Sequence, residues 1–281
     1  VSCGGATRLL RAEDGWFALS LARPDDVELV PALLERDDLG DQTWEAIAGA
    51  VASGAAGELV ARGRLLGLPV AALPDVPPIA ELAHPPLAPL PLRATRVAGP
   101  APTTRRLADM LVADLGSLWA GPLCASLLGS AGAQVVKVES TSRPDGARSG
   151  PRPFFDLLNA GKRGFAVDFR TSEGARALRA LLGRVDVVIE GSRPRALEQL
   201  GIDARALVAG GGPRVWVSIT GHGRTGEQRD RVAFGDDAAV AGGLVAWDDV
   251  GPCFCADAVA DPCTGLIAAA AALDALSAGG R

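Results

Sequence analysis

Hydrophobic residues in the second half of the chain gather in short runs, separated by longer segments with helical spacing. The runs Val135-Val136-Lys137-Val138 and Val187-Val188-Ile189 are typical of strands buried on both faces. Such runs predict strands over residues 111–115, 134–139, 165–169, 186–190 and 215–220. Helical patterns fall between them, over residues 122–131, 172–182 and 195–200. This alternation predicts an α/β fold with a doubly wound, mostly parallel, Rossmann-like sheet and right-handed crossovers.

The first part of the chain has a different pattern. A strand is predicted over residues 16–21, and helices over residues 25–34, 44–52 and 56–66. These elements indicate a small N-terminal α/β unit over residues 1–73. Prolines then crowd residues 74–104, and because proline fixes φ and removes a backbone donor, we expect an irregular linker there. The larger α/β domain would occupy residues 105–281.

Composition narrows the classes of partner. The net charge of −5 argues against a nucleic acid or an anionic membrane surface as the ligand of the whole molecule. No apolar run is long enough to cross a bilayer. Five cysteines, an odd count, argue against a disulfide framework and favour a reducing cytoplasm. Cys253 and Cys255 have no second ligand pair at zinc spacing, so we expect no metal.

Ligands of open parallel sheets gather where the strands end. After the first predicted strand of the larger domain, Gly121 lets the backbone approach a partner and Pro122 suits a helix start, whose free N–H groups could hold a phosphate. Arg170, at another strand end, could clamp an anion, and Gly191 permits close approach of a ligand. The alternative interpretation of Gly121 and Pro122 is an ordinary strand–turn–helix joint, and that of Arg170 is a solvated surface residue.

Asp261 stands directly before Pro262 and a long apolar run with helical spacing. This order places its carboxylate at a helix N-terminus, where the helix dipole favours the ionised form. Two interpretations follow from the residues: a structural N-cap, or a carboxylate available for chemistry.

A series of short motifs resembles the class III CoA-transferases, the CaiB–BaiF family that includes formyl-CoA transferases and α-methylacyl-CoA racemases. Each motif is weak alone, but their order and spacing are specific. They are Ala120-Gly121-Pro122, Gly132 to Glu139, Gly161-Lys162-Arg163 with Asp168 to Thr171, Val185 to Pro194, Leu197 to Gly201, Pro213 to Gly221, Arg224-Thr225-Gly226, and Asp261 to Gly265.

The resemblance implies that Asp261 is the nucleophile, forming a covalent aspartyl intermediate as coenzyme A moves from an acyl-CoA donor to a carboxylate acceptor. It also implies that coenzyme A, as substrate and product, is the only cofactor and that the protein is an interlocked cytoplasmic homodimer. The residues that match the coenzyme A contacts of the family are Leu118, Trp119, Ala120, Arg170, Gly191 and Ser192.

Departures from the family pattern leave alternatives open. Asp236 stands at the position that we align with the catalytic His of family racemases, which disfavours an α-methylacyl-CoA racemase. Residues before about 85 resemble the part of the family that follows the catalytic aspartate, and the chain opens on Val1. We therefore expect a permuted, tandem-fused or truncated member, and a non-catalytic acyl-CoA-binding partner is the remaining alternative.

Overall fold

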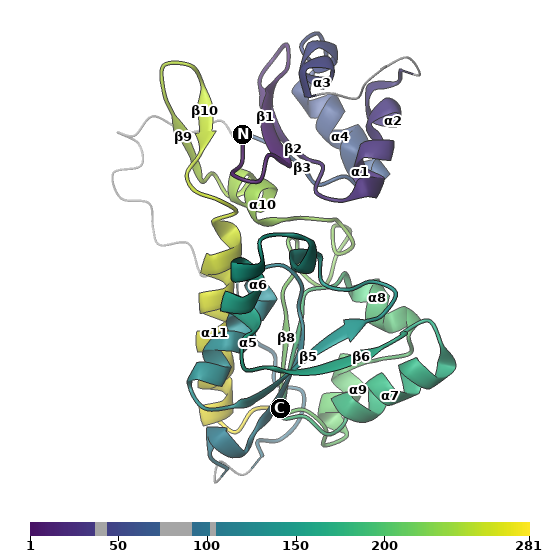
Figure 1. The fold of residues 1–281 in the computed structure, drawn as a ribbon, viewed down its shortest axis with the longest axis vertical. Helices are drawn as coiled ribbons and strands as arrows, with labels where there is room; N and C mark the ends of the chain where they lie inside the picture. The colour runs from purple at the N-terminus through teal and green to yellow at the C-terminus, as the bar shows by residue number, and fades with distance from the viewer. Residues whose placement is uncertain (37–43, 74–91, 102–104) are drawn as a thin grey trace. The chain divides into compact units, whose positions relative to one another are not determined.

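The computed structural model describes residues 1–36, 44–73, 92–101 and 105–281 (Figure 1). They form two compact units. Unit 1 comprises Val1–Leu92 and Arg231–Ala260, and unit 2 comprises Arg93–Asp230 and Asp261–Arg281. Most of the linker predicted over residues 74–104 lies outside the described residues.

Unit 2 is built on a five-stranded parallel sheet with the order β6-β5-β4-β7-β8. The strands are β4 (Leu111–Leu115), β5 (Gln134–Ser140), β6 (Arg163–Val167), β7 (Val187–Glu190) and β8 (Val215–Ser218). After β4 the chain adds β5 and β6 on one side of that strand, and then returns to add β7 and β8 on the other side of β4. Carboxyl ends of β4 and β7 therefore flank the point where the strand order reverses, which is where open sheets of this kind bind ligands.

Helices cover both faces of this sheet, and the doubly wound fold is confirmed. Val112 and Ile189 point into a core with helices α5 and α11, whereas Ala113 and Val188 point into a second core on the opposite face. Successive residues alternate between faces because a strand repeats every two residues. The helices of unit 2 are α5 (Ala120–Ser130), α6 (Arg152–Asn159), α7 (Ser172–Leu182), α8 (Pro194–Gln199), α9 (Ala204–Ala209) and α11 (Ala260–Ser277).

Strand β6 begins and ends earlier than its sequence pattern predicts. The hydrophobic pattern predicted a strand over residues 165–169, but Asp168 to Thr171 form a turn instead. The hydroxyl of Thr171 donates to the Asp168 carbonyl at 2.9 Å and accepts the Gly174 N–H at 3.0 Å. This N-cap starts α7, and the turn that it stabilises takes Phe169 out of the strand.

Unit 1 contains the antiparallel sheet β1-β2-β3, formed by Thr7–Arg11, Trp16–Ser20 and Val70–Ala72. The helix predicted over residues 25–34 is divided at Leu29, because Pro31 has no N–H with which to continue the first helical segment. The helices of this part are α1 (Pro24–Glu28), α2 (Val30–Leu34), α3 (Trp44–Val51) and α4 (Ala56–Leu66).

Residues 231–260 complete unit 1, although we expected them within the larger domain over residues 105–281. Helix α10 (Gly235–Ala241) places Val240 in a buried cluster with Ala18 and Ala71. The hairpin of β9 (Val245–Trp247) and β10 (Pro252–Phe254) adds Val245 and Phe254 to the same cluster. No helix within the described ranges is long and apolar enough to cross a membrane.

Candidate functional site

Helix α11 begins at the carboxyl edge of the sheet in unit 2. Its far end is tied to the opposite edge, because the Arg281 N–H donates to the carbonyl of Arg214, the residue immediately before β8, at 2.5 Å. The 18 residues of α11 span about 27 Å, long enough to cross the sheet from one edge to the other. Figure 1 shows α11 running beside the sheet of unit 2. The start of α11, which contains Asp261, therefore lies at the edge where ligands of such sheets bind.

The second turn of α11 packs closely against the start of α5. A Cβ atom at Gly265 would lie 2.9 Å from the Ala120 carbonyl oxygen and 3.0 Å from Leu123 Cδ2. Asp261 lies one helical turn before Gly265 and is partly exposed. The structure thus brings Asp261 toward the start of α5, at Ala120, which follows Leu118 and Trp119.

Asp261 lies inside the first turn of α11. It is therefore not the N-cap residue, which was one of the two interpretations of the Asp-Pro order. The helix begins at Ala260, which makes Pro262 its third residue. Proline is tolerated at each of the first helical positions because their N–H groups have no acceptor within the helix. The Asp-Pro order therefore does not locate the cap by itself. In either position the carboxylate lies close to the positive end of the helix dipole.

Gly121 serves a different purpose from the one that its sequence context suggested. A Cβ atom at Gly121 would lie 2.8 Å from the Cα of Gly116, and a Cβ atom at Gly116 would lie 2.7 Å from the Cα of Gly121. The two glycines let the turn after β4 cross the start of α5. The close partner of Gly121 is therefore the chain itself.

Residues Leu118, Trp119 and Ala120 form the joint between β4 and α5. Leu118 has a φ of +65°, a left-handed conformation that costs a residue with a side chain about 1–2 kcal/mol. The partly exposed Trp119 ring meets Phe154 edge-on, with 5.1 Å between ring centroids. Ala120 is buried. A partly exposed aromatic ring and a constrained turn at a strand end are suited to holding a ligand.

Four buried charges lie beneath this joint. Lys137 Nζ donates to Asp145 Oδ2 at 2.7 Å and to the Gly116 carbonyl at 2.5 Å. Lys162 Nζ donates to Asp114 Oδ2 at 2.8 Å and to the Pro122 carbonyl at 2.9 Å. Burial lowers the pKa of Lys162, an effect that the nearby Asp114 carboxylate opposes. The sequence pattern suggested Lys162 as a cation that could steer an anionic ligand and did not predict this buried cluster.

Gly191 and Ser192 follow β7, the strand next to β4. The Ser192 hydroxyl donates to Glu190 Oε2 at 3.3 Å, and Gly191 is exposed, with no described atom within 4 Å of a Cβ at that position. Glu190 is 1% exposed and also accepts from Trp216 Nε1 at 3.0 Å, Ser218 Oγ at 2.8 Å and Arg224. The buried carboxylate therefore fixes the strand end that carries Gly191 and Ser192.

Arg170 lies apart from the other candidate residues. It follows the edge strand β6, two strands or about 10 Å from β4. Its side chain is 75% exposed and donates to Asp168 Oδ2 at 2.8 Å. Hydrogen bonds from Arg170 lower the pKa of Asp168 to about 2. The structure thus groups residues 118–120, residues 191–192 and Asp261 around β4 and β7, and leaves Arg170 at the rim of the sheet.

Asp236, at the start of α10 in unit 1, is bound to the backbone. Its Oδ1 accepts the Ala258 N–H at 2.9 Å, and the carboxylate is buried. Ala258 has a φ of +43°. Asp236 therefore stabilises a left-handed turn three residues before Asp261 in the sequence.

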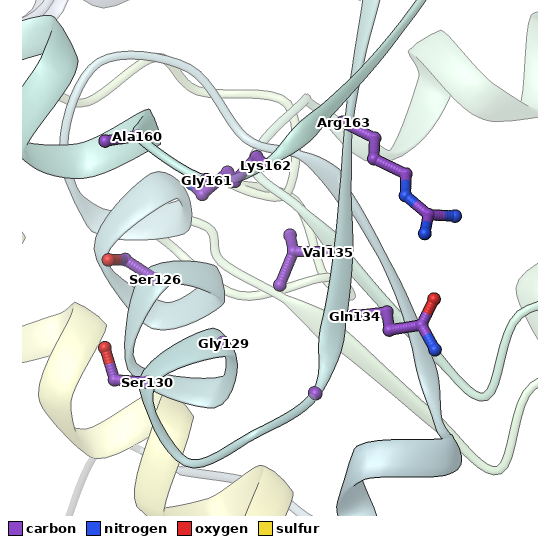
Figure 2. A pocket seen from close by; sticks show the side chains of 10 residues that line it. Ser126, Gly129, Ser130, Gln134, Val135, Ala160, Gly161, Lys162 and Arg163 are labelled. Atoms are coloured by element: carbon purple, nitrogen blue, oxygen red, sulfur yellow. The ribbon is translucent and has the colours of Figure 1, made fainter.

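A cavity of about 410 Å³ lies elsewhere in unit 2, between α5 and the first residues of β5 and β6. Figure 2 shows Ser126 and Ser130 on the helical side and Gln134 and Arg163 on the strand side. Because Gln134 and Arg163 open their strands, the cavity is at the amino edge of the sheet, away from the candidate residues. Among the residues that the structure describes, no group of His, Cys, Asp and Glu could hold a metal ion.

Several known proteins are similar to this chain in sequence and in fold. The chain is 34% identical over 149 residues to the succinyl-CoA–D-citramalate CoA-transferase of Chloroflexus aurantiacus, covering 50% of this chain and 37% of that protein. It is 31% identical over 188 residues to the succinate–glutarate CoA-transferase of Agrobacterium fabrum, covering 60% and 46%. A crystal structure of a CaiB/BaiF family protein from Brucella suis is similar with a TM-score of 0.56 and 32% identity, covering 63% and 50%.

The chain spans less than half the length of these two curated relatives. The family match nevertheless covers most of the chain, because the sequence model of CoA-transferase family III matches residues 107–281. That range contains the whole parallel sheet, the turn after β4 and helix α11. The chain therefore belongs to CoA-transferase family III.

Proposed function

We propose that the protein transfers coenzyme A from an acyl-CoA donor to a carboxylic acid acceptor, with Asp261 as the nucleophile. One observation carries the proposal: Asp261 lies in the first turn of α11, and α11 packs against the start of α5 beside residues 118–120. A partly exposed carboxylate at a helix N-terminus is accessible and is favoured in its ionised form.

The proposed transfer proceeds through acyl exchange without any oxidant or reductant. A carboxylate oxygen of Asp261 attacks the thioester carbonyl carbon. The carbon–sulfur bond breaks, coenzyme A departs as the thiolate, and the acyl group is now joined to Asp261 as a mixed anhydride. The thiolate then attacks the aspartyl carbonyl, which releases the donor acid and forms an aspartyl thioester. The acceptor carboxylate repeats these two steps in reverse order and restores Asp261. Each covalent intermediate replaces one difficult exchange by two easier ones.

The remaining candidate residues would hold the coenzyme A. Leu118, Trp119 and Ala120 at the end of β4, with Gly191 and Ser192 at the end of β7, flank the reversal in strand order where a nucleotide-bearing ligand fits best. Arg170, exposed at the rim, would attract a phosphate group of an extended ligand. We extend the proposal to an interlocked cytoplasmic homodimer, as the family resemblance implies.

The proposal is tested by trapping the covalent intermediate on the full-length protein. After incubation with a panel of acyl-CoA thioesters, intact-mass spectrometry should detect an adduct of coenzyme A that hydroxylamine removes and that peptide mapping places on Asp261. Asp261→Asn should fold normally but form no adduct and lose essentially all turnover, because an amide cannot form the anhydride.

Asp274→Asn is the matched control, since Asp274 is an exposed carboxylate near the other end of the same helix. It should keep both the adduct and the turnover. Near-normal turnover by Asp261→Asn would eliminate Asp261 as the nucleophile. Exchange of an α-proton with deuterated water, in the absence of coenzyme A transfer, would favour the racemase alternative.

A further inference from the structure

Backbone groups of the turn after β4 are held from beneath by buried charged side chains. The Gly116 N–H donates to Asp114 Oδ1 at 2.9 Å, and the Gly116 carbonyl accepts from Lys137 at 2.5 Å. Two residues later, the Leu118 N–H donates to Asp145 Oδ1 at 2.8 Å. Asp114, Lys137 and Asp145 are each no more than 3% exposed. These charges contact the buried side of the turn, whereas Ser117 is exposed and Leu118 and Trp119 are partly exposed.

The Asp145 end of this cluster also supports the unusual conformation of Leu118. Leu118 has a φ of +65°, which a residue with a side chain keeps only when its surroundings enforce it. Its N–H is bound by Asp145, and a Cβ atom at the neighbouring Gly146 would lie 3.2 Å from Leu118 Cδ2. Asp145 Oδ1 also accepts the Ala147 N–H at 3.0 Å, so the supporting loop is itself fixed.

Stability alone does not explain a buried ion pair at this place. Removing two charges from water offsets much of their mutual attraction, and apolar residues of similar volume often stabilise a protein as well or better. What apolar residues cannot supply is a set of donors and acceptors aimed at particular backbone atoms. Lys137 and Asp145 supply them to Gly116 and Leu118, the turn that leads into Trp119 and Ala120.

We propose that Lys137 and Asp145 are positioning residues for coenzyme A: by holding Gly116 and Leu118, they keep the turn after β4 in its binding conformation. This inference rests on the proposed function, because it takes residues 118–120 as coenzyme A contacts. Neither Lys137 nor Asp145 would touch the coenzyme A itself. Their loss should therefore weaken coenzyme A binding through the turn, beyond any effect on the stability of unit 2.

The test compares two buried aspartates at opposite edges of the same sheet. Asp145→Asn removes the charge that pairs with Lys137 at the carboxyl edge. Asp186→Asn is the matched control at the amino edge, where Asp186 accepts from Arg105 at 2.5 Å and from the Leu111 N–H at 2.9 Å. Each aspartate pairs with a cation and accepts from a backbone N–H, and each variant removes that buried charge. Only Asp145 contacts the turn after β4.

Isothermal titration with coenzyme A on the full-length protein, at a temperature well below both melting transitions, gives the dissociation constants. We expect Asp145→Asn to raise the dissociation constant about tenfold or more, the size expected from losing hydrogen bonds to a charged group, and Asp186→Asn to raise it less than threefold. Hydrogen exchange of residues 116–118 should become faster in Asp145→Asn only. Equal dissociation constants for the two variants would overturn the inference.

Gly146→Ala keeps the test decisive if Asp145→Asn does not fold. It changes no charge and adds a methyl group at the exposed start of the short 3-10 helix Gly146–Ser149, 3.2 Å from Leu118 Cδ2. This variant should weaken coenzyme A binding about threefold. An unchanged dissociation constant in this variant would then overturn the inference. Wild-type protein that binds coenzyme A but forms no aspartyl adduct would contradict the proposed transfer alone, whereas wild-type protein that binds none would overturn the positioning role as well.

Discussion

Replacing Gly265 by alanine tests the contact that brings Asp261 to the start of α5. Alanine is the better helix former, and Gly→Ala inside a helix ordinarily stabilises a protein by up to about 1 kcal/mol. At Gly265 the new Cβ would lie 2.9 Å from the Ala120 carbonyl oxygen and 3.1 Å from Leu123 Cβ. The oxygen belongs to the backbone of α5, so it cannot rotate away and one helix must shift.

The magnitude follows from the two opposing effects. Overpacking a close contact costs about 1–3 kcal/mol, which exceeds the gain from helix propensity. We therefore expect Gly265→Ala to lower the free energy of unfolding of unit 2 by about 0–2 kcal/mol, with about 1 kcal/mol as the central value. A shift of α11 would also move Asp261, so turnover should fall by more than the stability change alone explains.

Gly49→Ala is the matched control. Gly49 is exposed inside α3, and no described atom lies within 4 Å of a Cβ at that position. This variant should be stabilised by up to about 1 kcal/mol. Because the two units need not unfold together, hydrogen exchange of peptides from α11 and α3 is measured beside urea unfolding. If Gly265→Ala slowed exchange in α11 as Gly49→Ala does in α3, the tight packing of α11 on α5 would be refuted.

Two further predictions concern titratable groups of unit 2. The side-chain hydrogen bond from Arg148 lowers the pKa of Glu139 from its ordinary value of 4.5 to about 2. The stability that Glu139 contributes is therefore present above about pH 4.5 and lost as the pH falls toward 2, and Glu139→Gln should lose less stability than wild type between urea titrations at pH 5 and pH 3. Burial raises the pKa of Cys124 to about 12, so at pH 8 iodoacetamide should label exposed Cys263 but not Cys124 until urea unfolds the protein. Equal labelling of the two thiols in the native state would contradict the buried position of Cys124.

Local patterns were sufficient to predict most elements of the parallel sheet. The strand over residues 111–115 and the helix over residues 172–182 were predicted with the bounds that the structure has. The bounds of both elements depend on the spacing of hydrophobic residues that are close in sequence, and tertiary contacts favour the same bounds. Strand β6 was predicted two residues too late, because the Asp168–Thr171 turn competes with the hydrophobic pattern through hydrogen bonds that periodicity does not record.

The sequence by itself determined the family and the sheet, because the motifs and the hydrophobic runs of buried strands each consist of residues that are adjacent in the sequence. It also indicated the strand ends at which the candidate residues gather, since that rule depends on strand direction alone. Only the tertiary structure decided that Gly121 faces Gly116, that residues 231–260 complete unit 1, and that Lys137 and Asp145 hold the turn after β4. These are contacts between different elements of the fold, and such contacts leave no periodic trace in one sequence. The chain must fold before the distance between their atoms, and hence their chemistry, is set.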